Sequence, residues 1–230
     1  MKKSILQYAI EGKLVKQDPN DEPASVLLER VKAEKEKLIK EGKIKRDKNE
    51  SYIYQGDDKN YYENLPFETP FNWKWTKIGF ISDSYIGLTY KPSDVSSNGV
   101  IVLRSSNIKN GKLDLSDLVK VNCHIPDKLI TSKNDIIICA RNGSKKLVGK
   151  SAIITTDEKM TFGAFMAICK TRFYEYVHIY LQCSLFFSQL AETSGTTTIN
   201  QLTQKAFNNF LLPLPPLAEQ KRISNKINYN

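Results

Sequence analysis

Lysine, arginine and asparagine side chains gather between residues 101 and 150 in a way that suits binding to a polyanion. This block holds ten Lys and Arg residues against four Asp residues, in a chain of 230 residues whose formal net charge is +9. A concentrated basic region favours nucleic acid, the commonest polyanion in the cytoplasm. From charge alone, a lysine-rich face that is only solvated is an equally good interpretation.

Motifs for catalysis or for metal binding do not occur in the sequence. It has no G-x-x-x-x-G-K-[ST] phosphate loop, no H-E-x-x-H pair and no glycine-bearing methyl-donor loop. Residues 64–67 come near the tetrad with which DNA methyltransferases hold a flipped base, but Leu65 breaks the pattern, and a turn with a packed Phe is expected. The two histidines and the four cysteines lack metal-ligand or redox spacing. We therefore expect a protein that is not an enzyme, with reduced cysteines that serve packing.

Composition indicates a soluble, cytoplasmic protein with a substantial core. Hydrophobic residues make up 40% of the chain and charged residues 26%, which is ordinary for a globular protein. No apolar run approaches the ~18 to 20 residues that span a bilayer. The first residues form a short amphipathic stretch and do not read as a signal peptide.

Two amphipathic helices and a linker are expected before residue 64. Apolar spacing predicts a short helix over residues 4–11 and a longer one that begins near Pro23 and ends at Gly42. The longer helix has a narrow apolar stripe that must be buried against another surface. That surface belongs to its own domain, to a dimer mate or to another subunit. Residues 43–63 are polar with interleaved tyrosines, and they predict a linker that docks through those tyrosines.

Short β-branched runs after the linker predict a mixed, half-buried sheet. The runs are residues 100–103, 136–139, 152–155 and 164–169. Three Asn-Gly pairs predict tight turns between strands; they begin at Asn98, Asn110 and Asn142.

The last third of the chain predicts two helices and an extended stretch. Apolar residues at helical spacing predict one core-packed helix over residues 175–192. The prolines of 210–215 forbid a helix, and Pro216 suits the start of a new one. That helix would align Leu217, Gln220, Ile223 and Ile227 on one face.

Several stretches closely resemble the specificity subunits of type I restriction-modification systems. Residues 212–223 read LPLPPLAEQKRI and are similar to the segment that ends a target recognition domain in that family. Residues 194–202 resemble the stretch that precedes it. Residues 4–15 and 23–30 resemble the conserved region before such a domain, and the stretches inside that match its recurring core pattern are 99–111, 134–138 and 143–144.

This resemblance implies an α+β fold, in which a mixed twisted β-sheet target recognition domain is flanked by N- and C-terminal helical conserved-region segments. The implied parts are an N-terminal helical region (1–45), a linker (46–63), the recognition domain (64–213) and the start of a C-terminal spacer helix (214–230). Family members carry two recognition domains, so the chain resembles a half-length form. Its spacer helix would then stop early at Asn230, which places dimerisation through that helix in question.

The implied function is sequence-specific recognition of double-stranded DNA by a non-catalytic subunit. It would direct adenine methylation and restriction by partner modification and restriction subunits, and the modification subunit would bind S-adenosylmethionine. Half-length forms act as homodimers on gapped, near-palindromic sites. The alternative is a truncated or cassette-derived fragment, an assembly or decoy protein that docks modification subunits without productive DNA recognition.

Residue types suggest roles on DNA. Arginines Arg104 and Arg141 suit guanine, and Asn107 and Asn142 suit adenine edges, while the lysines would neutralise phosphates. Arg104 could instead cap the sheet. The expected DNA-binding residues are Thr89, Tyr90, Lys91, Arg104, Asn107, Lys109, Lys112, Arg141, Asn142, Ser144, Lys145 and Lys146. The expected partner-binding residues are Leu27, Leu28, Val31, Leu38, Ile223 and Ile227.

Overall fold

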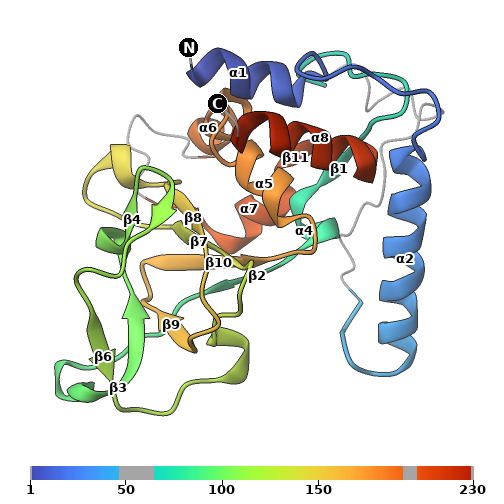
Figure 1. Cartoon of the computed structure of the whole chain (residues 1–230). Helices are drawn as coiled ribbons and strands as arrows, with labels where there is room; N and C mark the ends of the chain where they lie inside the picture. Colours follow the sequence, from blue (N-terminus) through green and yellow to red (C-terminus); the bar gives the residue numbers. More distant parts are fainter. Residues whose placement is uncertain (1, 47–64, 194–200, 229–230) are drawn as a thin grey trace. The chain divides into compact units, whose positions relative to one another are not determined.

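The chain divides into two compact units in a computed structural model that describes residues 2–46, 65–193 and 201–228 (Figure 1). Unit 1 combines Met1–Ile81 with Asn209–Asn230, and unit 2 is Ser82–Asn208. The predicted α+β class is confirmed. The boundaries of these units differ from those of the predicted domains. Residues 65–81 and the last helix belong to the same unit as the N-terminal helices. The functional limits 64–213 stay a prediction, and nearly all of the expected linker lies outside the described residues.

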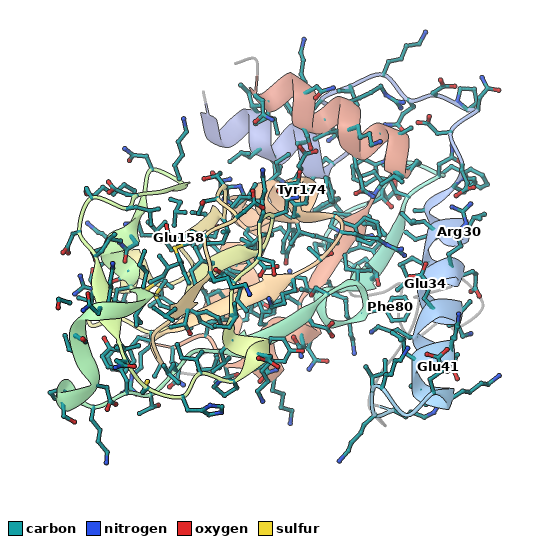
Figure 2. The ribbon with its side chains drawn as sticks, turned by 60° about the horizontal axis from the view of Figure 1, so that its bottom comes forward. Arg30, Glu34, Glu41, Phe80, Glu158 and Tyr174 are labelled. Atoms are coloured by element: carbon teal, nitrogen blue, oxygen red, sulfur yellow. The ribbon has the colours of Figure 1, made fainter. Side chains whose placement is uncertain are left out.

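Helices α1 (Lys2–Ile10) and α2 (Ala24–Lys40) open unit 1 and confirm the two predicted N-terminal helices. Along α2, Ala24, Leu27, Leu28 and Val31 are buried and form the predicted apolar stripe. The opposite face is charged, and Arg30, Glu34 and Glu41 follow one another along the helix in Figure 2. On this helix Lys35 lies 4.9 Å above the ring of Phe80, so α2 contacts helix α4 (Ile78–Ile81) within the same unit.

A short antiparallel pair joins the two ends of unit 1. Strand β1 (Lys74–Lys77) pairs with β11 (Leu211–Leu214), with Trp75 opposite Pro213. Proline cannot donate to a ladder, so it suits an edge position of this kind. The ring of Phe67 meets Trp75 edge to face at 5.1 Å, which confirms the expected packed Phe; Asn64 lies outside the described residues.

The C-terminal helix α8 (Leu217–Asn228) begins directly after Pro216, as predicted, but buries a polar face. Leu217 is exposed, whereas Glu219 and Gln220 are buried beside Ile223. The predicted apolar face of α8 is therefore wrong at its first residue, Leu217. The sequence pattern failed here because a buried carboxylate has no hydrophobic signature.

Glu219 is held by two donors from distant parts of unit 1. Trp73 Nε1 donates to Glu219 Oε2 at 2.9 Å, and Gln17 Nε2 donates to Oε1 at 2.5 Å. Arg222 on the same helix donates to Asp21, with one N–O distance of 3.1 Å. These bonds tie residues 17–21 to α8. Burial raises the pKa of Glu219 above its ordinary value, because desolvation outweighs the bonds from Trp73 and Gln17 that favour the charged form.

Glu219→Ala should lower the free energy of unfolding by about 2 kcal/mol, because it leaves the buried Trp73 N–H and the Gln17 amide without an acceptor. Thermal unfolding followed by circular dichroism would measure this. Glu219→Gln is the matched control.

The pH dependence of stability follows from the raised pKa of Glu219. A group whose pKa is raised in the folded state stabilises most below its unfolded pKa, so the difference in free energy of unfolding in favour of wild type over Glu219→Gln should shrink as the pH rises from about 4 to 7. An advantage that grows with pH would contradict this.

Two sheets build unit 2 (Figure 1). The larger has six strands in the order β2-β10-β7-β8-β5-β4, and the smaller has three in the order β6-β3-β9. The strands of the larger sheet are β2 (Asp83–Ile86), β4 (Ile108–Lys109), β5 (Lys112–Leu113), β7 (Ile136–Cys139), β8 (Ser151–Ile153) and β10 (Met166–Lys170). Those of the smaller are β3 (Val95–Leu103), β6 (Val119–Val121) and β9 (Met160–Phe162).

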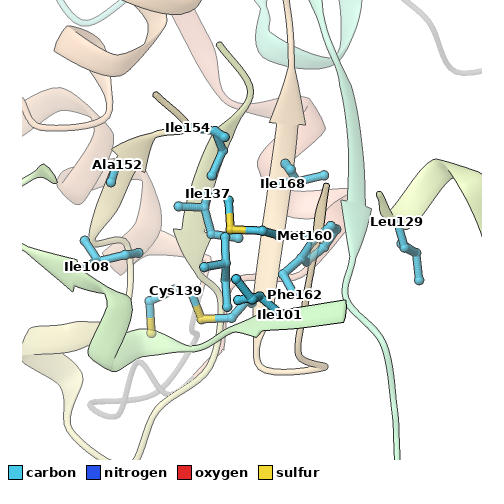
Figure 3. Packing of buried hydrophobic residues seen from close by; sticks show 12 residues of the cluster. Ile101, Ile108, Leu129, Ile137, Cys139, Ala152, Ile154, Met160, Phe162 and Ile168 are labelled. Carbon is cyan, nitrogen blue, oxygen red and sulfur yellow. The ribbon is translucent and has the colours of Figure 1, made fainter. Parts of the chain in front are cut away.

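The four predicted strand regions are confirmed as β3, β7, β8 and β10, and they enclose the core of unit 2. Figure 3 shows this packing, in which Ile137, Cys139, Ile168, Met160 and Phe162 come together from β7, β10 and β9. Every residue of β7 is buried, which fits a central strand that reads as a continuous apolar run.

Two other expectations for unit 2 are wrong. Asn98-Gly99 does not form a turn but lies inside β3, at an irregularity in its pairing with β6 between Val95 and Val100. The predicted helix 175–192 is two helices, α5 (Tyr174–Tyr180) and α6 (Ser184–Glu192). Leu181 and Cys183 remain buried across the break, so the apolar spacing that predicted one helix continues through the connection. The remaining helix of the unit is α7 (Gln204–Asn209).

No helix within the described part of the chain is both long and apolar enough to cross a membrane.

Gly149→Ala should destabilise the protein by about 1–3 kcal/mol. Gly149 has φ +86°, and an added Cβ would lie 3.0 Å from ring atoms of both Phe186 and Phe187. Gly143→Ala is the control, since nothing lies within 4 Å of its added Cβ, and it should change stability by under 1 kcal/mol. Equal losses in denaturant titrations of the two variants would contradict the argument.

Candidate nucleic-acid interface

The hairpin of β4 and β5 presents two of the predicted phosphate-binding lysines. Asn110 and Gly111 connect the strands with φ of 53° and 74°, so both central residues are left-handed, as a type I′ turn requires. This Asn-Gly turn is confirmed. The strands are only two residues long, and Lys109 and Lys112 stand opposite each other, both exposed.

Asn107 is buried and holds the loop that leads into this hairpin. Its Oδ1 accepts from the backbone N–H of Arg104 at 2.9 Å, and its Nδ2 donates to the carbonyls of Asp114 and Asp117 at 2.9 and 2.8 Å. With 1% of its surface exposed, it has no free edge for a base. Its predicted role at an adenine is therefore wrong, and its role is to position the loop.

Two basic side chains of this loop are paired with carboxylates. Arg104 contacts Asp117 at 2.9 Å, and Lys109 contacts Asp114 at 2.7 Å. The bond from Lys109 holds the pKa of Asp114 well below its ordinary value, and bonds from Ser116 add to the effect. Exposed pairs of this kind contribute little to stability and are screened by salt. These two cations are thus partly neutralised in the free protein.

The loop after β7 lies against the first loop. Asn142 Nδ2 donates to Ser105 Oγ at 3.3 Å, and Asn142 Oδ1 accepts from the backbone N–H of Ser144 at 2.9 Å. The expected tight Asn-Gly turn is wrong in form: Gly143 is not among the residues with positive φ, and the Asn142 side chain makes the turn instead. Ser144 and Lys146 are exposed beyond it, together with Lys145.

A third loop, residues 163–165, joins β9 to β10 and was missed by sequence reasoning. We expected Ala164 and Phe165 to begin a strand, but the strand begins at Met166. Phe165 is 59% exposed. Its carbonyl accepts from the backbone N–H groups of Ala140 and Arg141, both at 2.9 Å, and the Arg141 guanidinium carbon lies 5.3 Å from the centre of its ring.

The segment after β2 reaches the same loop. Leu88 forms a bridge with Gly163, and its N–H donates to the Phe162 carbonyl at 2.7 Å. An added Cβ on Gly163 would lie 3.9 Å from the ring of Tyr90. Tyr90 is half-buried, while Thr89 and Lys91 are exposed.

The structure therefore brings the predicted DNA-binding residues together in unit 2. We call residues 89–91, 104–112, 141–146 and 163–165 the basic loop surface. These segments contain seven Lys and Arg residues and no Asp or Glu. The only signal that pointed to residues 163–165 was an aromatic residue two positions after a glycine, which is also ordinary strand sequence.

The predicted partner-binding residues are mostly covered by the chain itself. Leu27, Leu28, Val31 and Ile223 have between 0 and 6% of their surface exposed. For these four the prediction of a partner contact is wrong, because the chain itself already buries their side chains. Leu38 and Ile227 are half-buried, and for them it stays a prediction.

Burial keeps Cys169, Cys183 and His178 of unit 2 in their neutral forms. Burial raises the pKa of Cys169 to about 12 and that of Cys183 to about 11, so both thiols stay protonated and unreactive at neutral pH. Burial also lowers the pKa of His178. These groups behave as packing residues, as expected from their spacing.

Asn107→Ala should lower the free energy of unfolding by about 2–4 kcal/mol, because it removes three hydrogen bonds of a buried amide. Asn142→Ala, which removes the bonds of a half-buried side chain to Ser105 and Ser144, should cost less than about 1 kcal/mol. Chemical denaturation of both variants would measure the difference. An Asn107→Ala variant as stable as wild type would refute the role of Asn107 in positioning the loop.

Comparisons with known proteins identify the family to which these features belong. Residues 70–228 match the family described as type I restriction modification DNA specificity domain. The chain is 35% identical to the type I restriction enzyme EcoAI specificity subunit of Escherichia coli, over 99% of this chain and 38% of that protein. It is 31% identical to the EcoEI specificity subunit of Escherichia coli, over 99% of this chain and 39% of that protein.

Solved structures agree on the fold. The HsdS subunit from Thermoanaerobacter tengcongensis superposes with a TM-score of 0.54 at 18% identity, covering 89% of this chain and 48% of that one. A chain from a type I R-M system structure gives a TM-score of 0.57 at 19% identity, with the same coverage. The chain spans less than two fifths of the length of the EcoAI and EcoEI specificity subunits that it matches.

Proposed function

Because the chain belongs to the family of type I restriction-modification DNA specificity proteins, we propose that it is a DNA-recognition subunit that directs methylation by partner proteins. The Escherichia coli relatives are named as specificity subunits of restriction enzymes. Such a subunit contributes binding and leaves the chemistry to others. In this role the chain works in the cytoplasm, where the DNA is.

The observation that carries this proposal is the convergence of four separate segments of unit 2 on the basic loop surface. Phosphate contacts require cations spread over a surface, and base reading requires exposed planar or hydrogen-bonding side chains among them. Both are present: Lys91, Lys112 and Lys146 are exposed, and the exposed Arg141 and Phe165 lie against each other on the same surface. Asn107 and the β4–β5 turn keep residues 104–112 in place.

The partners follow from the same role. We propose that the chain binds double-stranded DNA, modification subunits that hold S-adenosylmethionine and methylate adenine, and a restriction subunit. Two copies would read a gapped, near-palindromic target, since a two-fold assembly reads two equivalent half-sites. The comparisons give no specific support to the alternative of an assembly protein without DNA recognition.

Co-purification with the cognate modification subunit, followed by labelled methyl transfer to a random-sequence DNA pool and sequencing of the modified sites, tests this function. The expected result is a stable complex that methylates one gapped motif. A complex that forms but methylates without sequence preference would support the assembly protein instead. Methyl transfer by the isolated chain would overturn the non-catalytic assignment.

Lys112→Ala and Lys146→Ala should each weaken DNA binding equally on all sequences. Each lost phosphate contact should reduce the slope of log K against log salt concentration by about 0.9. Fluorescence anisotropy at several salt concentrations would measure the slope. Lys159→Ala is the control, because Lys159 is exposed on unit 2 but lies outside the basic loop surface. An unchanged slope for both test variants would show that DNA binds elsewhere.

A further inference from the structure

Phe165 is a large apolar side chain that is exposed to water on the basic loop surface. It is 59% exposed, and the charged guanidinium of Arg141 lies 5.3 Å from its ring centre. Hydrophobic residues are common on surfaces, but this one stands inside a charged surface that comprises four segments. An exposed aromatic ring among cationic side chains suits contact with a ligand whose outer groups are charged and whose inner groups are apolar.

The backbone around Phe165 is fixed by strong local bonds. Its carbonyl accepts from the N–H groups of both Ala140 and Arg141 at 2.9 Å. The following residue, Met166, pairs with Cys139 in the centre of the sheet. Ala140 in turn accepts from the N–H of Leu202 at 2.7 Å. The ring is thus presented by a backbone that the β7–β10 ladder holds in register.

Arg141 is held against this ring. Its guanidinium carbon lies 5.3 Å from the ring centre, within the range of a cation–π contact. Stacking restricts a long side chain that would otherwise move freely in solvent. The contact therefore orders a planar, five-donor group beside an apolar edge.

On the premise of the proposed function, we propose that Phe165 and Arg141 read two neighbouring base pairs as one unit. Phe165 contacts the C5-methyl group of a thymine in the major groove. Arg141 donates to O6 and N7 of a guanine at the adjacent step. These are the partners that an apolar ring and a guanidinium select on base edges. Successive bases of a strand are about 3.4 Å apart, so two stacked groups reach two adjacent bases.

Deoxyuridine provides the test for Phe165, because it lacks only the methyl group of thymine. Once the methylated motif is known, each thymine of one half-site is replaced in turn by deoxyuridine, and binding of the complex is measured. For wild type, one replacement should weaken binding about fourfold, the value of one buried methyl-sized group. Phe165→Ala should bind the thymine site five- to tenfold more weakly and should no longer distinguish it from the deoxyuridine site.

Phe187→Ala is the matched control. Phe187 is another exposed phenylalanine of unit 2, with 42% of its surface exposed on α6, outside the basic loop surface. This variant should keep the fourfold discrimination between thymine and deoxyuridine. Circular dichroism melting of both variants would show that they are folded.

Arg141 is tested by 7-deazaguanine, which lacks the N7 acceptor. At the guanine next to the sensitive thymine, this base should weaken wild-type binding about tenfold and should have no added effect on Arg141→Ala. Arg141→Lys keeps the charge but loses the planar fork, so it should resemble Arg141→Ala in base preference while keeping the salt slope of wild type.

Three results would overturn this assignment. No deoxyuridine replacement affects wild type, or the sensitive thymine is not beside the sensitive guanine, or Phe165→Ala loses the modification subunit while its DNA binding is unchanged. The last result would make Phe165 a protein contact. If wild type selects no motif at all, the proposed DNA-recognition function itself fails, and that outcome is seen before any variant is made.

Discussion

The antiparallel pairing of β7 with β10 is the interaction on which the candidate interface depends. It places Met166 opposite Cys139 and Ile168 opposite Ile137 in the middle of the six-stranded sheet. The loop before β10 and the loop after β7 therefore leave the sheet side by side, and the Phe165 carbonyl meets the N–H groups of Ala140 and Arg141. A slip of one residue would exchange the side chains on the two buried faces of these strands and disrupt the packing on both. The buried apolar faces of both strands prevent that slip.

Four strands of this scaffold were predictable from the sequence, because each has a local signature, whereas β2, β4, β5, β6 and β9 were not predicted. β-branched runs marked β3, β7, β8 and β10, and proline marked both β11 and the start of α8. The misses have physical causes of their own. Nothing local distinguishes a buried, fully bonded asparagine such as Asn107 from an exposed one, since its partners at Asp114 and Asp117 come from a loop that closes only in the fold.

For the candidate site, the sequence predicted a set of DNA-binding residues but not which of their side chains are exposed and which are buried or paired. The convergence of residues 89–91, 104–112 and 141–146 follows from charge and family resemblance. Pairing is a tertiary property: Arg104 pairs with Asp117, 13 positions later in the chain, and Lys109 pairs with Asp114, five positions later. The one signal at Phe165, its position two residues after a glycine, did not place it on the surface, because an exposed aromatic and a core aromatic look alike until the strand's first residue is known.

The division of the chain gives the basic loop surface an evolutionary freedom. Unit 2 is an insertion between the two segments of unit 1, and the chain leaves and re-enters unit 1 at adjacent strands, where β1 pairs with β11 and the Ile78 N–H donates to the Phe210 carbonyl at 3.0 Å. The bonds of Glu219 and Arg222 that close unit 1 involve no residue of unit 2. A gene segment that encodes residues 82–208 can thus be exchanged by recombination for one with other loops, while the frame that receives it keeps its own internal bonds. If the chain reads DNA as proposed, a lineage with such an architecture acquires a new target in one genetic step instead of through many point substitutions.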